Sequence, residues 1–417
     1  MGGDEFPRSR RALTALALGA ALLRPGAAHP ATSFIPIPEI ITDPNEGNTV
    51  GLLGVVLFLD QKDEIRYMLA PDLQYNRTKG VFPTFRLFGY PTPLRRYSIL
   101  IGKSTTKDED YELEFSDRGY WEGRAFILAS FVHERDSTDR FFGFGNESRS
   151  TPHRLPERGP VLGEGESNYT GRNTVAQATP GVWLLPSVNL SYRMRIRRFS
   201  VERGQVRGIP FIGVQHPETR DHGLEPGVYW AHQVALTYDS RDSFDIPTHG
   251  ALALAYVEMA DRRLGSSTSF VKFGAEWRDF IPLRQGNPIL ALHALANYTS
   301  GDLKTPFWEQ SSLGGRRTLR GFGSDRFIDF NRSLGAAELR TRVWQRKLFG
   351  VNAELELAPF AEAGQVFRRV TGSPVSDLHF VYGLGFRGVV RPQIVGFVDV
   401  GRGSEGTAIF TGVDYPF

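Results

Sequence analysis

The chain has 417 residues and no cysteine, and its 49 basic and 46 acidic residues leave a formal charge of only +3. The absence of cysteine excludes a disulfide scaffold, a thiolate nucleophile and a cysteine-ligated metal site. Because charges of both signs are interspersed along the chain, the small net charge gives no support to nucleic acid as a partner. The 45 glycines, 30 phenylalanines and 14 tyrosines favour a β-rich protein over a helical one.

The first 28 residues have the order of a secretory signal peptide. Three arginines within residues 8–11 precede an apolar run over residues 12–23, and small residues end at Ala28. A basic, an apolar and a small-residue region in this order direct export and are then removed. We expect cleavage after Ala28, followed by a short periplasmic segment over residues 29–50.

From residue 51 onward the sequence alternates between apolar and polar residues, which is the pattern of membrane β-strands. The polar faces carry charges of both signs, which a wet lumen tolerates better than the dry core of a soluble sandwich. Bacterial single-chain barrels have even strand numbers, so we predict about sixteen antiparallel strands over residues 51–417, with residues 95–121 as the doubtful place. The seventeen candidate segments are 51–60, 65–75, 81–90, 95–103, 111–115, 123–133, 169–178, 186–197, 228–239, 250–259, 269–280, 289–298, 339–343, 351–359, 380–386, 394–401 and 409–417.

A long connection over about residues 301–334 contains a glycine- and arginine-rich stretch. It resembles the signature loop of the BamA/TamA-type outer-membrane assembly barrels (the bacterial surface antigen family). In that family the loop folds into the barrel and carries a tip of the form (Val/Ile/Leu)-Arg-Gly-(Phe/Tyr). Five candidate strands follow the loop, as the family pattern requires. The matching residues are Gly314, Gly315, Leu319, Arg320, Gly321 and Phe322.

Other segments match the same family in the same order along the chain. Residues 239–250 resemble its Asp-x-Arg-Asp…Pro-Thr-x-Gly stretch, residues 360–364 its Phe-x-Asp-x-Gly strand with Glu362 in place of Asp, and residues 383–387 the next strand. Tyr415 and Phe417 resemble the C-terminal β-signal that the barrel-assembly machinery reads. The strand-motif residues are Asp239, Arg241, Asp242, Gly250, Phe360, Gly364, Gly383 and Gly385.

The resemblance implies a transmembrane β-barrel in the Gram-negative outer membrane, with the signature loop folded into its lumen. It implies a role in inserting or translocating proteins or lipids. Outer-membrane lipid, the barrel-assembly machinery and client proteins or lipids are the implied partners. Residues 29–50 are too few for a POTRA domain, the periplasmic module that receives clients, so the resemblance is to a subgroup without such domains.

Arg320 is the residue of the loop whose partner the sequence predicts. Its planar guanidinium suits a carboxylate. Counting by two along the polar face from Glu354 and Glu356 reaches Glu362, which should therefore point into the lumen. Asp399 has the polar-side parity of a nearby strand and is the second candidate. We expect an ion pair that pins the loop; the alternative is a solvated Arg320 at an ordinary loop tip.

No motif for catalysis stands out. The chain has neither a Gly-x-Ser-x-Gly elbow nor a His-Glu-x-x-His pair, and its nine histidines are scattered. We therefore expect no catalytic residue, no metal site and no cofactor, and no enzymatic activity. The alternatives to the assembly role are a passive channel for small polar solutes and, less favoured, an outer-membrane phospholipase. The basic run over residues 193–198 alternates arginine with Met194 and Ile196, which favours barrel wall over nucleic-acid or anionic-lipid binding.

Overall fold

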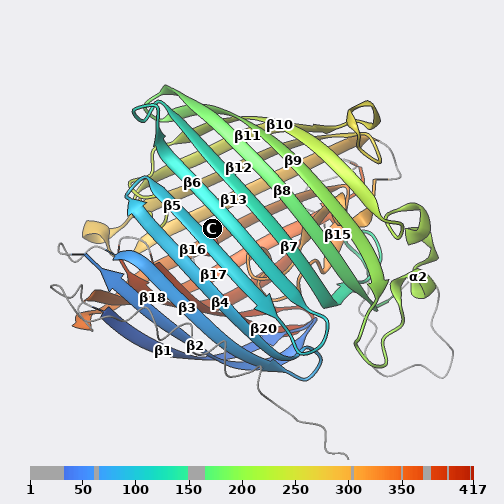
Figure 1. The fold of residues 1–417 in the computed structure, drawn as a ribbon, viewed down its shortest axis with the longest axis horizontal. Coiled ribbons are helices and arrows are strands. Elements are labelled where there is room, and N and C mark those ends of the chain that lie inside the picture. Colours follow the sequence, from blue (N-terminus) through green and yellow to red (C-terminus); the bar gives the residue numbers. More distant parts are fainter. Residues whose placement is uncertain are drawn as a thin grey trace, which may run out of the picture.

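The computed structural model describes residues 32–60, 65–148, 165–301, 305–348, 351–369, 377–391, 394–413 and 415–417. Eighteen strands form one antiparallel sheet that closes on itself, so the predicted all-β barrel is confirmed (Figure 1). The expected signal peptide, residues 1–28, lies outside the described residues. No helix in the described ranges is long and apolar enough to cross a membrane.

The barrel strands follow one another around the ring in chain order, from β1 to β13 and then from β16 to β20. They are β1 (Thr32–Asp43), β2 (Gly47–Leu59), β3 (Ile65–Asn76), β4 (Gly80–Thr92), β5 (Arg95–Lys103), β6 (Glu109–Tyr120), β7 (Ala125–Phe141), β8 (Ser167–Leu185), β9 (Val188–Arg203), β10 (Gly227–Asp239), β11 (Gly250–Ala260), β12 (Phe270–Pro282), β13 (Ile289–Gly301), β16 (Asn331–Leu348), β17 (Val351–Phe367), β18 (His379–Val390), β19 (Ile394–Gly403) and β20 (Gly406–Val413). The connections contain the two-stranded sheet of β14 (Ser311–Leu313) and β15 (Phe327–Asp329), and the short helices α2 (Ile212–Gln215), η1 (Pro217–Asp221), η2 (Arg262–Leu264), η3 (Arg284–Gly286) and η4 (Phe307–Glu309).

The predicted count of about sixteen strands is wrong, and so is the first barrel strand at residue 51. Each of the seventeen candidate segments overlaps a barrel strand, including β5 and β6 in the doubtful region. The eighteenth strand is β1, which lies in the segment expected to be periplasmic and pairs with β2 along its whole length. Pro36 and Pro38 make this segment unlike a barrel strand in the sequence, because proline cannot donate a ladder hydrogen bond and is confined to sheet edges. Strand β1 tolerates them because, in the part of the chain that the structure describes, its other neighbour β20 pairs with it only at Thr42↔Ile409.

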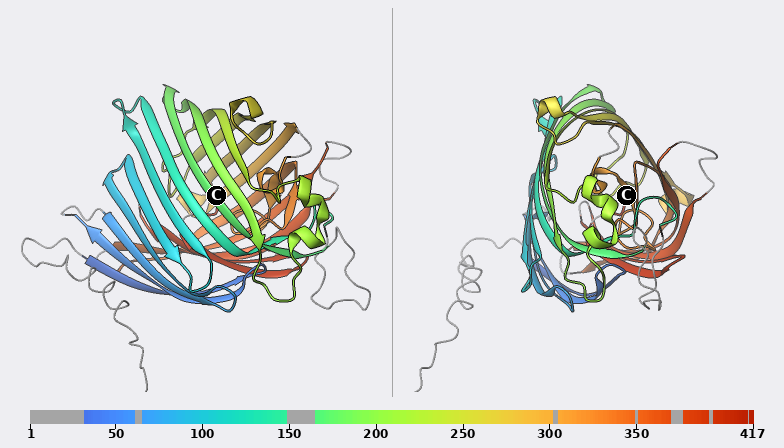
Figure 2. Two further views of the ribbon diagram at one scale, coloured as in Figure 1. Left: turned by 45° about the vertical axis from the view of Figure 1, so that its right-hand side comes forward. Right: turned by 90° about the vertical axis from the view of Figure 1, so that its right-hand side faces the viewer.

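The two ends of the barrel differ in the length of their connections. The first and the last strand begin and finish at the same end, because the number of strands is even. The strand ends that flank the long connections, between β7 and β8, β9 and β10, and β13 and β16, are all at the opposite end, where α2 also lies (Figure 2). Outer-membrane barrels have short periplasmic turns and long extracellular loops. The end with the long connections is therefore extracellular.

The wall has an apolar outer face and a charged inner face. Phe380 and Tyr382 of β18 are 65% and 64% exposed, whereas Val381 between them is 2% exposed. On the inner face of β16 and β17, Glu338 and Glu362 are buried. Because successive side chains of a strand point to opposite faces, the outer set meets lipid and the inner set meets the lumen.

The place of β1 in the wall can be tested with cysteines, because the chain has none of its own. Ile40 of β1 lies directly opposite Val50 of β2, and both are exposed. We expect the variant Ile40→Cys/Val50→Cys to form an internal disulfide on oxidation, measured by loss of maleimide labelling after unfolding. Tyr75 pairs with Val50 on its far side, so Ile40→Cys/Tyr75→Cys places the thiols two strands apart and should keep both free. Free thiols in both variants would contradict the pairing of β1 with β2 in the barrel wall.

Candidate functional site

Arg320 lies at the centre of a group of buried charges. Its Nε and its backbone N–H donate to Glu362, at 2.8 and 2.6 Å, and its Nη1 donates to Glu338 at 2.9 Å and to Asp399 at 2.7 Å. None of these four side chains has exposed area. The structure thus brings Arg320 together with both partners that the sequence offers, Glu362 and Asp399. Glu338 is a third carboxylate that the sequence reasoning did not single out.

Two further arginines balance the charge of this group. Arg387 Nη2 donates to Glu338 at 3.1 Å, its Nη1 donates to Asp399, and Arg340 Nε donates to Glu338 at 3.0 Å. Three arginines therefore face three carboxylates. Removing one member of such a buried group leaves an uncompensated charge, which costs far more than an exposed ion pair contributes. Counting by two along β16 and β18 places Glu338, Arg340 and Arg387 on the inner face, but it does not show which of them contact one another.

Two glycines of β18, Gly383 and Gly385, leave space for the side chains of this charged group. The Arg320 Cζ lies 3.6 Å above the centre of the Phe360 ring, a cation–π contact. A Cβ at Gly383 would lie 2.3 Å from the Phe360 ring, and one at Gly385 would lie 2.5 Å from Arg387 Nη1. Real Cβ atoms do not approach neighbours so closely, so a larger residue at either position would displace Phe360 or Arg387.

The backbone around Arg320 lies directly against β19. A Cβ on Gly321 would be 2.5 Å from the backbone nitrogen of Gly403, and one on Gly401 would be 2.2 Å from the carbonyl oxygen of Arg320. Leu319 is fully buried and has a φ of +47°, a conformation that costs energy for a branched side chain. The ion pairs and the apolar packing of Leu319 against Phe322 hold it there.

A second group of contacts holds the same segment to β9. Glu309 of η4 accepts hydrogen bonds from Arg195, at 2.9 Å to each of its two oxygens, and from Arg197 at 3.2 Å. Trp308 stacks on Phe199 with ring centres 4.8 Å apart. Burial opposes ionisation of Glu309, but Arg195 and Arg197 prevail and hold its pKa at about 2. The sequence reasoning missed Glu309, although it placed Arg195 and Arg197 on the inner face.

The residues of the Asp-x-Arg-Asp stretch hold a different loop, at the periplasmic end. Arg241 pairs with Asp239 at 2.8 Å, and Asp242 accepts from the hydroxyl and the backbone N–H of Thr248, at 2.6 and 2.8 Å. A Cβ on Gly250 would lie 2.2 Å from the carbonyl oxygen of Ser240, so glycine is required where the loop returns to β11. These contacts fold residues 240–249 on themselves rather than towards Arg320.

The same loop reaches across the periplasmic mouth. Asp245 pairs with Arg96 of β5, and Arg118 of β6 lies 3.8 Å above the ring of Phe244. Ile246 is buried in a cluster with residues of β18 and β19 and with Tyr415. The loop therefore contacts walls on either side of its own strands.

The C-terminal residues lie elsewhere than the sequence predicts. The alternation extends the last strand to the end of the chain, with Tyr415 and Phe417 on one side of it, but β20 ends at Val413. The Tyr415 hydroxyl donates to Glu356 at 2.7 Å, and Arg340 donates to the carbonyl oxygen of Phe417 at 3.0 Å. Pro416 has no N–H for a ladder, and both aromatic side chains are buried against these inward charges.

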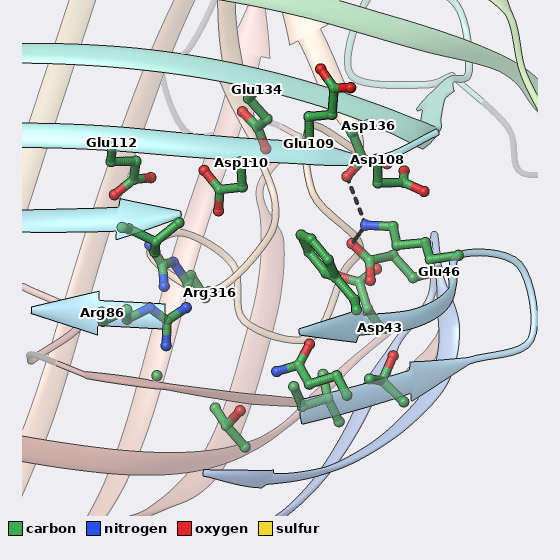
Figure 3. A pocket seen from close by; sticks show the side chains of 18 of the residues that line it. Asp43, Glu46, Arg86, Asp108, Glu109, Asp110, Glu112, Glu134, Asp136 and Arg316 are labelled. Carbon is green, nitrogen blue, oxygen red and sulfur yellow. Dashed lines mark hydrogen bonds and ion pairs between the residues drawn. The ribbon is translucent and has the colours of Figure 1, made fainter. Parts of the chain in front are cut away.

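An acidic cavity of about 540 Å³ lies on the inner side of β1 to β7. Figure 3 shows Asp110, Glu112 and Glu134 pointing into it, with Arg316 from the segment before Arg320 among them. Lys79 donates to two further carboxylates of the cavity, at 2.7 and 2.9 Å. Within the described ranges, no group of three or more histidine, aspartate or glutamate residues is placed to hold a metal ion.

The comparison with protein families places the chain. The model of the Omp85 superfamily domain matches residues 96–387, more than half of the sequence. The chain belongs to the Omp85 superfamily. Its location is accordingly the outer membrane of a Gram-negative cell, and it shares the superfamily of the BamA/TamA-type barrels.

Solved structures of this kind are similar in fold and distant in sequence. BamA from Haemophilus ducreyi, lacking POTRA domains 1–3, gives a TM-score of 0.53 at 11% identity, over 91% of this chain and 75% of that one. CdiB from Escherichia coli gives a TM-score of 0.48 at 10% identity, over 94% of this chain and 62% of that one. A search of curated protein sequences gives no match. The BamA likeness therefore supports the barrel fold alone.

Replacing Arg320 tests the buried charge group. We expect Arg320→Ala to lower the free energy of unfolding by about 3–5 kcal/mol, because it leaves carboxylates without their counter-charge. The measurement is the temperature at which the folded barrel loses its fast electrophoretic mobility, together with protease protection of the segment. Arg317→Ala removes an exposed arginine of the same segment and should change neither. An Arg320→Ala barrel that matches wild type in assembly, heat resistance and protection would contradict the role.

Acid should release the β9 contact at a defined pH. The pKa of Glu309 is lowered from 4.5 to about 2, so its contribution to stability is complete above pH 4.5 and declines as the pH falls towards 2. We expect Glu309→Gln to lower the melting temperature at pH 7, and the difference from wild type to shrink between pH 4.5 and pH 2. A difference that does not vary with pH over this interval would show that the charge of Glu309 is not what holds the segment.

Proposed function

We propose that this Omp85 barrel is a non-catalytic protein that inserts or translocates proteins or lipids at the outer membrane through the junction of β1 and β20. The observation that carries the proposal is the small number of residue pairs between these two strands. Thr42↔Ile409 is its only residue pair in the described part of the chain, whereas β1 pairs with β2 from Thr32 to Asp43. Since each ladder hydrogen bond contributes about 0.5–1.5 kcal/mol, this junction opens at the least cost.

Both edges of the junction support strand exchange. From Thr32 to Ile41, the edge of β1 that faces β20 carries backbone groups without a ladder partner among the described residues. Such an edge is a template for another strand. Tyr415 and Phe417 contact Arg340 and Glu356 instead of extending β20 along β1. A client strand that adds to β1 meets no competing strand over most of its length.

The segment over residues 305–330 fits a loop folded into the lumen, as the family resemblance implies. It is attached to β9 through Glu309 and to β16, β17 and β19 through Arg320. The inward-facing carboxylates that it meets are on the wall, so the segment must reach the interior to contact them. In this proposal the loop keeps the lumen closed while the junction opens sideways.

The loop also bridges the extracellular end of the junction. Asn45, in the turn after β1, donates to the carbonyl oxygen of Ser324 at 2.7 Å. Arg326 pairs with Glu405, in the turn before β20, at 2.6 Å. Through these two contacts, the loop links the ends of β1 and β20 near Thr42. Opening therefore starts at the periplasmic end, where a client arrives.

The polar cavity of Figure 3 favours the second candidate function, a passive channel for small polar solutes. Its acidic lining would select cations. The attached loop argues against free passage, so we place this function second.

Locking the junction separates the two functions. We expect Thr42→Cys/Ile409→Cys, once oxidised, to stop the barrel in proteoliposomes from accelerating the folding of an eight-stranded outer-membrane barrel added from urea, and a reductant to restore it. The matched lock Tyr192→Cys/Val234→Cys joins a pair of β9 and β10 that should not move. Full activity with the junction locked would overturn the proposal. Steady, cation-selective conductance of the locked barrel in a planar bilayer would establish the channel instead.

A further inference from the structure

A group of arginines faces outward at the extracellular end of β7, β8 and β9. Arg135 of β7 lies directly opposite Arg172 of β8, and Arg198 of β9 lies opposite Thr174, two residues along from Arg172. Arg135 shares its face with the exposed Phe131, and Arg198 shares its face with the exposed Met194. All three arginines therefore point to the outside of the barrel, on three neighbouring strands.

These arginines have too few partners within the protein. Glu202 accepts from Arg135 at 2.6 Å and lies 3.4 Å from Arg172, so one carboxylate serves two cations. The Nε atoms of Arg135 and Arg172 have no hydrogen-bond partner. Arg198 is exposed and has no ion-pair partner among the residues that the structure describes. Like charges directly opposite each other destabilise a sheet, so the group is short of negative charge.

The neighbouring charges do not supply it. Glu109 of β6 lies directly opposite Arg135, but it pairs with Lys103 of β5 at 2.8 Å, so these two neighbours add no net charge. The ring of His133 bonds to the hydroxyl of Thr174 at 2.8 Å, between Arg135 and Arg198. Among the described residues, the three arginines and Glu202 therefore keep two uncompensated positive charges.

The wall below the arginines is apolar. Phe131, Met194 and Val234 are exposed there, and Val228 lies directly opposite Arg198. In the membrane this surface meets acyl chains, while the arginines stand at its extracellular border, at the height of lipid headgroups. A ligand with a doubly charged head and an apolar tail fits both parts of the surface.

We propose that Arg135, Arg172 and Arg198 bind the phosphate monoester of an outer-leaflet lipid, whose acyl chains lie on the apolar wall of β7–β10. A phosphate monoester carries about −1.5 to −2 charges at pH 7, which matches the charge that the group lacks. Arginine binds phosphate through paired N–H donors. The side chain of Arg172 is 43% exposed and Arg198 is exposed, so both can reach a headgroup. A phosphodiester headgroup carries one negative charge and neutralises only half of the excess.

The test measures lipid binding to the purified, folded full-length barrel in detergent by native mass spectrometry. The probes are phosphatidic acid and phosphatidylglycerol with the same acyl chains, and diphosphorylated lipid A. We expect phosphatidic acid and lipid A to bind at least about tenfold more tightly than phosphatidylglycerol, the ratio that one charged hydrogen bond supplies. Equal binding of phosphatidic acid and phosphatidylglycerol would overturn the proposal.

Variants locate the site and separate lipid from free phosphate. R172Q/R198Q should weaken phosphatidic acid binding about tenfold or more, and R198Q alone should weaken it without disturbing any internal ion pair. The matched control R262Q/R263Q removes two arginines of η2 at the same end of the barrel and should bind as wild type. Unchanged binding by R198Q and R172Q/R198Q would refute the site. Displacement of phosphatidic acid by equimolar inorganic phosphate would show a free-phosphate site and overturn the lipid assignment.

Discussion

A strand that crosses hydrocarbon must pair all its backbone N–H and C=O groups, because no water is present to replace a missing partner. The architecture of this barrel follows from that constraint, which forces the sheet to close on itself. The same hydrocarbon surroundings favour apolar side chains on the outer face of the wall. The constraint also makes the junction of β1 and β20 exceptional, because among the described residues the ring closes there through the single pair Thr42↔Ile409. The neighbouring strand pairs form long ladders, so this junction is the place where another strand can most readily supply the missing partners.

Charged side chains in the lumen attach residues 305–330 to two separate parts of the wall. On β16, β17 and β19 they form a neutral buried group around Arg320, and on β9 they hold Glu309. Both anchors belong to one segment of the chain, which also touches the turns on either side of the junction through Ser324 and Arg326. The segment is therefore attached where the wall is well paired and bridges the wall where it is poorly paired. This arrangement joins residues 305–330 to the junction of β1 and β20.

Local patterns explain which parts were predictable. The parity of Glu362 and Asp399 follows from counting by two along a strand, and both meet Arg320. Strand β1 was not predictable from alternation, because Pro36 and Pro38 are typical of a loop and are tolerated only beside an unpaired edge. Glu338 has the same parity as many inward residues, and nothing local marks it as a partner of Arg320. The inward turn of Tyr415 and Phe417 depends on Arg340 and Glu356, which belong to other strands.

The class of fold, the two faces of most strands and the identity of the loop arginine can be derived from the sequence, because a period of two and a short motif are local properties. The packing of distant segments sets the eighteen strands of the ring and its nearly unpaired seam. It also brings three carboxylates to Arg320, and gathers Arg135, Arg172 and Arg198 on the outside. These features depend on which strands become neighbours and in which register. Register is fixed by contacts between residues far apart in the chain, and alternation within one strand does not record it.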